Sequence, residues 1–279
     1  MTAPAKPGRE LDAPASESGR RRILVLETMP PVSWLGAESN GTGWLRRLLP
    51  DSELVGVPAY DGRSPLPKTA GFVAAIVPGS LAAVYERAPW MLRLEAYLRG
   101  LHAAGFPVLG ICFGHQILAS ALGGAVVRNP LGREFGFCEL RLTDAGRAHP
   151  TLFAGLPHVF RGAQGHYDVV SELPPGAALL AESDHGVQSF AHGSVLGVQF
   201  HPEISGAVLA AIAEHDAAEL AAAGQDVTAL AAELRTIDLS EASAVVPNFV
   251  AGLSALTLGP SPNPGRGETQ LGAARTPSG

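Results

Sequence analysis

A short apolar run leads directly into a cysteine between two glycines at Pro107-Val108-Leu109-Gly110-Ile111-Cys112-Phe113-Gly114-His115-Gln116. Residues 107–110 predict a buried strand, and residues 117–122 predict a small-residue helix that ends at Gly123-Gly124. A G-x-S-x-G elbow uses the same strand-to-helix turn to hold a nucleophile on a sharp bend. The segment therefore predicts a strand, an elbow with Cys112 at its tip, and a helix.

The residues around Cys112 suit a reactive thiol. Gly110 and Gly114 let the strand and the helix approach closely. The N-terminus of the helix beneath Cys112 favours a thiolate through its unpaired N–H groups and its dipole. The alternative is a small buried side chain without a chemical role, since free cysteine is among the most buried residue types. The elbow favours the catalytic interpretation.

Before the elbow, apolar runs alternate with a helical pattern. Buried strands are predicted at residues 23–26, 54–57 and 74–77. A helical pattern begins at Pro89 and is expected to end at Gly100 and Gly105. The third strand ends at Pro78-Gly79-Ser80, a turn that brings the backbone close to another group.

After the elbow, the chain is richer in β-type sequence. Further strands are predicted at residues 125–128, 138–142, 159–164, 178–183, 187–190 and 195–200. His192-Gly193 is typical of a hairpin turn. Residues 206–256 predict helices, with a break near Gly224 and a cap at Ser240. The whole alternation predicts an α/β fold with an open, mostly parallel sheet flanked by helices.

The composition fits a folded domain and excludes several classes of protein. Of 279 residues, 46% are hydrophobic and 16% charged, which is enough apolar sequence to bury a core. The net charge is −6 and the basic residues are scattered apart from Arg20-Arg21-Arg22, which argues against nucleic-acid binding. No apolar run approaches the roughly 20 residues of a membrane helix. The only cysteines, Cys112 and Cys138, form neither a disulfide scaffold nor a CxxC zinc pair, so a reducing cytoplasm is the expected location.

The two ends of the chain differ in composition from the part between them. Residues 1–21 and 259–279 are rich in Pro, Gly, Ser and charged residues, and they lack periodic apolar positions. We expect two disordered tails there. No linker composition or solenoid repeat interrupts residues 22–258, which are expected to form a single domain.

A second segment, Val198-Gln199-Phe200-His201-Pro202-Glu203, supplies what a thiolate nucleophile requires. The nucleophile needs a base that accepts and returns a proton, and the base needs an orienting partner. His201 follows a predicted strand, where side chains enter the crevice of an open sheet. Glu203 can accept a hydrogen bond from the ring nitrogen that faces away from Cys112. The alternative is a surface histidine beside a glutamate; the two segments together favour a Cys-His-Glu triad.

These two segments resemble the class I glutamine amidotransferase domains. The matching residues are Gly110-Ile-Cys-Phe-Gly-His-Gln116 and Gly197-Val-Gln-Phe-His-Pro-Glu203, which correspond to the family's Gly-x-Cys-x-Gly-x-Gln elbow and His-Pro-Glu segment. The resemblance implies a flavodoxin-like fold over about residues 22–258. It also implies that Cys112 attacks the side-chain amide carbon of glutamine, releasing ammonia and forming a γ-glutamyl thioester that water hydrolyses. His201 would be the acid/base and Glu203 its orienting partner.

The tetrahedral intermediate of that reaction carries an oxyanion, which backbone N–H groups can stabilise. Phe113, directly after the nucleophile, is one expected donor. By the resemblance, the other donor is Gly79 or Ser80, and many family members have a second glycine in place of Ser80. A positive φ at Ser80 would be strained. An ordinary surface turn is the alternative interpretation of this segment.

The resemblance assigns three further residues to the substrate. Gln116 is expected to face the substrate amide; the alternative is a polar residue that satisfies the first helical turn. His166 falls where the family has a Ser-His segment that holds the glutamine, and Gly165 replaces that serine, so one side-chain contact is lost. A hydrogen-bonded residue at a strand end is an equally good interpretation of His166.

No metal or cofactor is expected. His115 and His185 lack the spacing to Asp or Cys that a metal site needs, and they are interpreted as structural or solvent-facing residues. Cys138 lies in a strand pattern and is interpreted as a core residue.

Glutamine hydrolysis usually supplies ammonia to a synthase, and the sequence after Glu203 shows no phosphate loop or second α/β pattern. We therefore expect a separate glutaminase that supplies an ammonia-accepting synthase in trans. The segment Gly79-Ser80-Leu81-Ala82-Ala83-Val84-Tyr85-Glu86, with Pro89-Trp90, looks like the stand-alone branch related to GMP synthetase glutaminase domains, which includes γ-glutamyl peptidases. One alternative is thus a γ-glutamyl peptide hydrolase. The other is a non-catalytic binding protein, against which the intact Cys112 and His201 argue.

Overall fold

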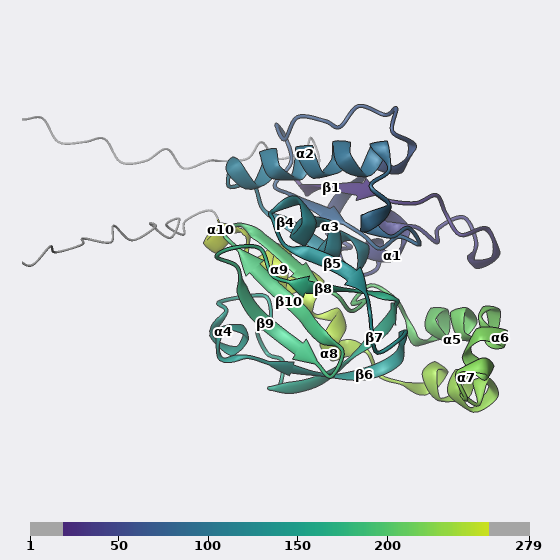
Figure 1. The fold of residues 1–279 in the computed structure, drawn as a ribbon. Helices are drawn as coiled ribbons and strands as arrows, with labels where there is room; N and C mark the ends of the chain where they lie inside the picture. The colour runs from purple at the N-terminus through teal and green to yellow at the C-terminus, as the bar shows by residue number, and fades with distance from the viewer. Residues whose placement is uncertain (1–18, 257–279) are drawn as a thin grey trace, which may run out of the picture.

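The computed structural model describes residues 19–256, which form a central nine-stranded sheet between helices (Figure 1). The strand order is β2-β1-β3-β4-β11-β10-β9-β6-β7, and β5 pairs with β8 in a separate two-stranded sheet. The strands are β1 (Arg21–Glu27), β2 (Ser52–Pro58), β3 (Ala74–Val77), β4 (Val108–Ile111), β5 (Ala125–Arg128), β6 (Glu134–Leu142), β7 (Val159–His166), β8 (Asp168–Glu172), β9 (Ala178–Ser183), β10 (Gly186–His192) and β11 (Val195–Val198).

The helices surround this sheet and follow its strands along the chain. They are α1 (Gly41–Arg46), α2 (Pro89–Ala103), α3 (Phe113–Ala121), α4 (Asp144–Ala148), α5 (Gly206–His215), α6 (Ala217–Ala222), α7 (Val227–Thr236), α8 (Ser240–Ser243), α9 (Val245–Ala251) and α10 (Leu253–Leu256). Three single 3-10 turns are η1 (Ser33–Leu35), η2 (Ala59–Asp61) and η3 (Val84–Glu86).

The sheet is parallel on one side and antiparallel on the other. β1 pairs in parallel with β2 and β3, β3 with β4, and β4 with β11. From β11 onward the pairing is antiparallel through β10, β9, β6 and β7. Since β3, β4 and β11 are parallel neighbours, the segments that follow them start from the same edge of the sheet. The predicted open α/β sheet is confirmed, and it brings Gly79, Cys112 and His201 to one place.

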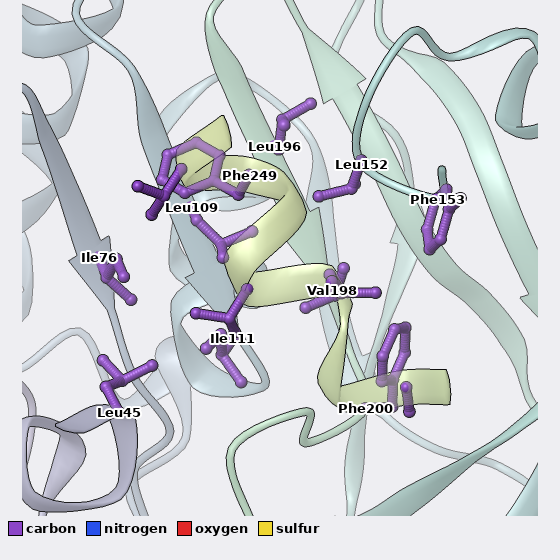
Figure 2. Close-up of a cluster of buried hydrophobic side chains, with 14 of the residues drawn as sticks. Leu45, Ile76, Leu109, Ile111, Leu152, Phe153, Leu196, Val198, Phe200 and Phe249 are labelled. Atoms are coloured by element: carbon purple, nitrogen blue, oxygen red, sulfur yellow. The ribbon is translucent and has the colours of Figure 1, made fainter. Parts of the chain in front are cut away.

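Side chains alternate between the two faces along the parallel strands. In β1, Ile23 and Val25 belong to one buried cluster, and Leu24 and Leu26 belong to another. Figure 2 shows the first cluster, where α9 crosses the strands and Phe249 is buried among aliphatic side chains of the sheet. Helices α2 and α3 cover the second cluster. Fully apolar strands are expected wherever helices cover both faces of a parallel sheet.

The predicted strands are present, and one helix is longer than predicted. β3 has the predicted bounds, and the hairpin at His192-Gly193 joins β10 to β11. The prediction that Gly100 ends its helix is wrong, because α2 continues to Ala103. Gly100 is exposed, whereas Leu98 and Leu101 on either side are buried. Tertiary packing of those two leucines thus outweighs the weak helix propensity of one glycine.

Two local features differ from the sequence expectations. β8 is not predicted, because its short sequence Asp168-Val-Val-Ser-Glu172 has only two apolar residues. Ser240 is the first residue of α8 and not its cap; its N–H donates to Oδ1 of Asp238 at 2.8 Å. The capping residues are found elsewhere: Ser205 caps α5 and Asp226 caps α7 through their side-chain oxygens.

Helices α5, α6 and α7 extend away from the sheet beside β6 and β7 (Figure 1). They follow directly on the His201-Pro202-Glu203 segment. A third buried cluster joins α5 and α7 to β6 through Leu209, Leu234 and Phe135.

The described residues begin close to the predicted domain boundary. β1 starts at Arg21, one residue before the predicted domain of residues 22–258. Residues 1–18 and 257–279, which contain most of the two predicted tails, lie outside the described residues. No helix between residues 19 and 256 has both the length and the apolar character needed to cross a membrane.

Candidate active site

Cys112 occupies the turn between β4 and α3 in a conformation that side chains rarely adopt. Its φ is 51° and its ψ is −105°, and its N–H donates to the carbonyl oxygen of Val198 at 2.9 Å. A Cβ on Gly110 would lie 2.4 Å from the backbone of Gly114, and a Cβ on Gly114 would lie 1.9 Å from the carbonyl oxygen of Val77. Both glycines are therefore required by close packing. The predicted elbow is present, and backbone strain of this kind, about 1–3 kcal/mol, is typical of functional sites.

His201 and Glu203 follow β11 and meet Cys112 at the adjacent strand end. Nδ1 of His201 lies 2.8 Å from Oε1 of Glu203. Glu203 is fully buried and His201 is nearly so. A Cβ on Gly79 would lie 3.0 Å from Cε1 of His201 and 3.7 Å from Cβ of Cys112, so this glycine faces both residues. The structure thus brings together the three predicted triad residues and the predicted oxyanion turn.

The surroundings of His201 favour its charged form. Burial alone lowers the pKa of the imidazole, but the negative charges of Glu203 and Cys112, with hydrogen bonds to both, raise this pKa well above its usual value. The Oε2 atom of Glu203 is buried without a hydrogen-bond partner among residues 19–256. The imidazolium is thus the group that balances the buried carboxylate. This arrangement favours the imidazolium form of His201 beside Cys112.

The backbone N–H groups of Ser80 and Phe113 have no acceptor in the described part of the chain, and Ser80 lines the same cavity as Cys112. Phe113 is the first residue of α3, whose N–H has no partner within the helix. Thr28 holds the turn: its hydroxyl donates to the carbonyl oxygen of Gly79 at 2.5 Å, and Ser80 Oγ donates to the carbonyl oxygen of Thr28 at 3.1 Å. Ser80 does not have a positive φ. Its presence in place of a second glycine therefore introduces no backbone strain.

His166 lines the same cavity as Cys112, but both of its ring nitrogens are occupied. Nε2 lies 2.9 Å from Oε2 of Glu134, and Nδ1 lies 3.0 Å from the carbonyl oxygen of Asp168. Burial raises the pKa of Glu134, but its hydrogen bond to His166 and the charge of that ring lower it overall, so Glu134 is an acceptor. Both ring nitrogens are thus engaged within the fold, and neither is free for a ligand.

Gln116 and Gly165 also line this cavity. Nε2 of Gln116 donates to the carbonyl oxygen of Asp168 at 2.9 Å and to Oε1 of Gln199 at 3.1 Å. These bonds use both amide hydrogens and leave the Gln116 carbonyl oxygen as the group that can meet a ligand. A Cβ on Gly165 would have no atom within 4 Å, so the replacement of the family's serine leaves open space.

A cavity of about 450 Å³ opens at the triad. Its floor is formed by Gly79, Ser80, Cys112, Gln116 and His201. Its other polar lining residues are Tyr85, Glu86, Arg128, Arg133, His166, Tyr167, Asp168, His215 and Asp216. Its apolar lining residues include Met29, Val32, Trp34, Leu35, Trp44 and Ile212.

Sequence reasoning missed the apolar lining. Trp34 stacks on His215 at the end of α5, with ring centroids 4.1 Å apart and planes 7° apart. This contact joins the loop after β1 to the α5–α7 helices. Neither residue belongs to a motif. One sequence signal could have identified Trp34 as a lining residue. It lies in the loop that follows a parallel strand, on the edge of the sheet that carries the elbow.

His115, His185 and Cys138 lie outside the candidate triad, and Cys138 is only partly buried, so the expectation that it is a core residue is wrong. His115 is fully buried beside Phe190, with ring centroids 5.0 Å apart, and burial lowers its pKa to about 3. Nδ1 of His185 lies 2.8 Å from Nδ2 of Asn129. Burial raises the pKa of Cys138 to about 12, so its thiol stays protonated. Within residues 19–256, no group of three or more His, Cys, Asp or Glu residues could hold a metal ion.

Comparisons with known proteins agree with this geometry. The family model described as "Glutamine amidotransferase class-I" matches residues 59–212, more than half of the chain. A glutamine-hydrolyzing GMP synthase of Aeropyrum pernix is 38% identical over 163 residues, which are 57% of this chain and 29% of that protein. Gamma-glutamyl peptidase 5 of Arabidopsis thaliana is 36% identical over 156 residues, which are 53% of this chain and 61% of that protein. The chain thus spans less than two thirds of these curated relatives.

A solved structure shares the fold. A glutamine amidotransferase of Thermotoga maritima aligns with a TM-score of 0.67 at 20% identity, covering 86% of this chain and 99% of that one. At this identity the likeness shows the fold alone, and the matched family model carries the assignment. Together with that model, the elbow and the open sheet show that this chain belongs to the class I glutamine amidotransferase family.

Proposed function

We propose that this chain hydrolyses γ-glutamyl amide bonds, of which the side-chain amide of glutamine is the simplest, with Cys112 as the nucleophile. The observation that carries the proposal is the arrangement of His201, whose Nδ1 lies on Glu203 while the same ring contacts Gly79 and Cys112. A base oriented by a buried carboxylate and paired with a thiol at a strand-to-helix elbow is suited to acyl transfer.

In the first half of the reaction, the Cys112 thiolate attacks the amide carbon and forms a C–S bond. The carbonyl oxygen becomes an oxyanion, and the N–H groups of Ser80 and Phe113 are the proposed donors to it. The His201 imidazolium then gives its proton to the amide nitrogen. The C–N bond breaks and the amine or ammonia departs. A γ-glutamyl thioester remains on Cys112.

In the second half, neutral His201 takes a proton from water as the water oxygen attacks the thioester carbon. The oxyanion collapses, the C–S bond breaks, and glutamate leaves with its new carboxyl group. His201 is again protonated and Cys112 is again a thiolate, so the pair returns to its starting state. Glu203 holds the ring in one orientation and stabilises its charge in both halves.

Two substrates are compatible with this chemistry. Glutamine, with the ammonia passed to a synthase in trans, is the sequence expectation, and the relatives named as glutamine-hydrolyzing GMP synthases support it. A γ-glutamyl peptide is supported by the relative named gamma-glutamyl peptidase 5. The cavity of about 450 Å³ favours the second substrate, since its volume is typical of pockets for ligands larger than one amino acid.

The proposal is tested by measuring the release of glutamate from glutamine and from a γ-glutamyl dipeptide. Turnover is expected in the natural protein and is expected to be lost in Cys112→Ala, whereas Cys138→Ala retains it. A glutamine analogue with an electrophilic carbon in place of its amide should label one cysteine, identified by mass spectrometry of peptides. Labelling that persists in Cys112→Ala would remove Cys112 as the nucleophile.

A further inference from the structure

We propose that the apolar part of the cavity binds the amine portion of the substrate, so that the preferred substrates are γ-glutamyl amides of aromatic or other bulky apolar amines and amino acids. This inference rests on the proposed function and specifies its leaving group. Three features of the cavity support this inference. They are its volume, the presence of both charged and apolar side chains in its lining, and the position in the sequence of the residues that form the apolar set.

The volume exceeds what a glutaminase needs. Pockets of roughly 300–1,000 Å³ enclose ligands of drug size, and this cavity holds about 450 Å³. With glutamine bound, the only leaving group is ammonia, which needs no subsite. Gly165 adds to the free space, since a Cβ there would meet no atom within 4 Å.

The lining contains two kinds of side chain, charged and apolar. A γ-glutamyl group carries an ammonium and a carboxylate at its α-carbon, and it needs side chains of both signs. The cavity offers Arg128 and Glu86, with Asp168, whose carboxylate accepts a hydrogen bond from Tyr85 at 3.0 Å. The aliphatic side chains of Val32, Leu35 and Ile212 offer such charges no hydrogen-bond partner, and a polar group buried without partners is destabilised. The apolar set therefore fits the other end of the substrate.

The apolar set is already formed without a ligand. Trp34 is stacked on His215, yet 44% of its surface is exposed. Trp44 and Ile212 pack against the buried cluster that contains Leu209. A rigid aromatic ring with a free surface binds flat apolar groups well, because little side-chain entropy is lost on contact.

These residues lie inside the cavity that Cys112 also lines, which favours a small substrate over the surface of a partner protein. They also lie largely outside the part of the chain that matches the family. The family model matches residues 59–212, whereas Trp34 and Trp44 precede that region and His215 follows it. The two tryptophans of the apolar set thus come from a segment outside the region that matches the family. The apolar set is a site for selecting among γ-glutamyl substrates.

The test compares kcat/KM for γ-glutamyl-phenylalanine, γ-glutamyl-glycine and glutamine. We expect at least a tenfold preference for the phenylalanine peptide over the glycine peptide. A tenfold preference corresponds to a free-energy difference of about 1.4 kcal/mol. Burial of about 55 Å² of apolar surface supplies this difference at about 25 cal/mol per Å². Trp34→Ala should reduce the preference at least fivefold. Leu92→Ala is the matched control, because Leu92 is 40% exposed on α2 and does not line the cavity.

Equal kcat/KM for the two dipeptides, or an unchanged preference in Trp34→Ala, would overturn the inference and leave the proposed hydrolysis intact. A binding experiment separates the two ideas. Calorimetry with Cys112→Ala should give at least tenfold tighter binding of γ-glutamyl-phenylalanine than of γ-glutamyl-glycine, and this difference should be lost when Trp34→Ala is added. Turnover of none of the three substrates would contradict the proposed function. Equal binding of the two peptides would contradict the apolar site.

Discussion

The hydroxyl of Thr28 donates a 2.5 Å hydrogen bond to the carbonyl oxygen of Gly79 and thereby fixes the peptide that joins Gly79 to Ser80. In a trans peptide the C=O and N–H groups point in opposite directions. The Ser80 N–H therefore points away from Thr28. Since Gly79 faces both His201 and Cys112, the peptide is held at the place where the proposed oxyanion would form.

Replacing this hydroxyl should impair catalysis more than substrate binding. Thr28→Val keeps the shape of the buried side chain and removes its donor, so the Gly79–Ser80 peptide is free to rotate. Loss of a whole oxyanion donor costs about 10²–10³ in kcat, and for this indirect effect we expect roughly a tenfold decrease in kcat with little change in KM. Thr28→Ser, which keeps the hydroxyl, should restore kcat. An unchanged kcat in Thr28→Val would show that the bond does not position the donor.

Neutralising Glu203 should change the pH dependence of the reaction. Its negative charge raises the pKa of His201, so Glu203→Gln should lower that pKa. The alkaline limb of kcat/KM, where the imidazolium loses its proton, should then move to lower pH. We also expect kcat/KM to fall by roughly 10²–10⁴-fold without vanishing, because Glu203 orients the base and does not exchange the proton.

The control for this experiment is Glu139→Gln, which removes an exposed carboxylate on β6 that does not line the cavity. It should leave both the rate and the alkaline limb unchanged. If the alkaline limb of kcat/KM lies at the same pH in Glu203→Gln as in the natural protein, Glu203 does not set the charge of His201.

The residues of the candidate triad could be predicted from sequence because each belongs to a short local pattern. Cys112 lies in a strand–elbow–helix unit, and His201 and Glu203 lie just after an apolar strand. Parallel pairing of neighbouring strands then brings the two segments together without any further information. Local pattern fails where tertiary packing decides the structure, as at Gly100, where buried neighbours carry α2 past the glycine.

The cavity wall could not be predicted in this way. The Trp34–His215 stack joins two segments that lie far apart in the chain, and no local pattern marks either residue. The same holds for the Nε2 bond of His166 to Glu134, which engages a ring nitrogen of a residue that the family resemblance assigns to the substrate. One contact depends on the pairing of β7 with β6 and the other on how α5 packs beside the sheet, which only the folded structure defines.

The elbow glycines should be essential for stability as well as for geometry. Gly114→Ala would place a Cβ 1.9 Å from the carbonyl oxygen of Val77, a backbone atom that cannot move aside cheaply. Overpacking of this kind typically costs about 1–3 kcal/mol, and we expect at least that loss in the free energy of unfolding from urea denaturation.

Gly100→Ala is the matched substitution without this clash. The site is exposed in the last turn of α2, with no neighbouring atom outside the helix backbone within 4 Å of the new Cβ. We expect a gain of about 0.5–1 kcal/mol, because alanine is the better helix former. A similar effect of the two substitutions on stability would contradict the close approach at the elbow.

The buried His115 should make the fold sensitive to acid. Its pKa is lowered to about 3 in the folded protein, whereas an exposed histidine has a pKa near 6.5. Between these two values the unfolded chain binds one more proton than the folded chain, so stability falls as pH falls. The loss in the free energy of unfolding from this one group approaches about 1.4 kcal/mol per pH unit below pH 6.

His115→Leu removes the titrating group. The free energy of unfolding from urea titrations at pH 7, 6 and 5 should therefore fall less steeply in the variant than in the natural protein. Parallel curves for the two proteins would mean that His115 gains its proton in the folded state as readily as in the unfolded chain.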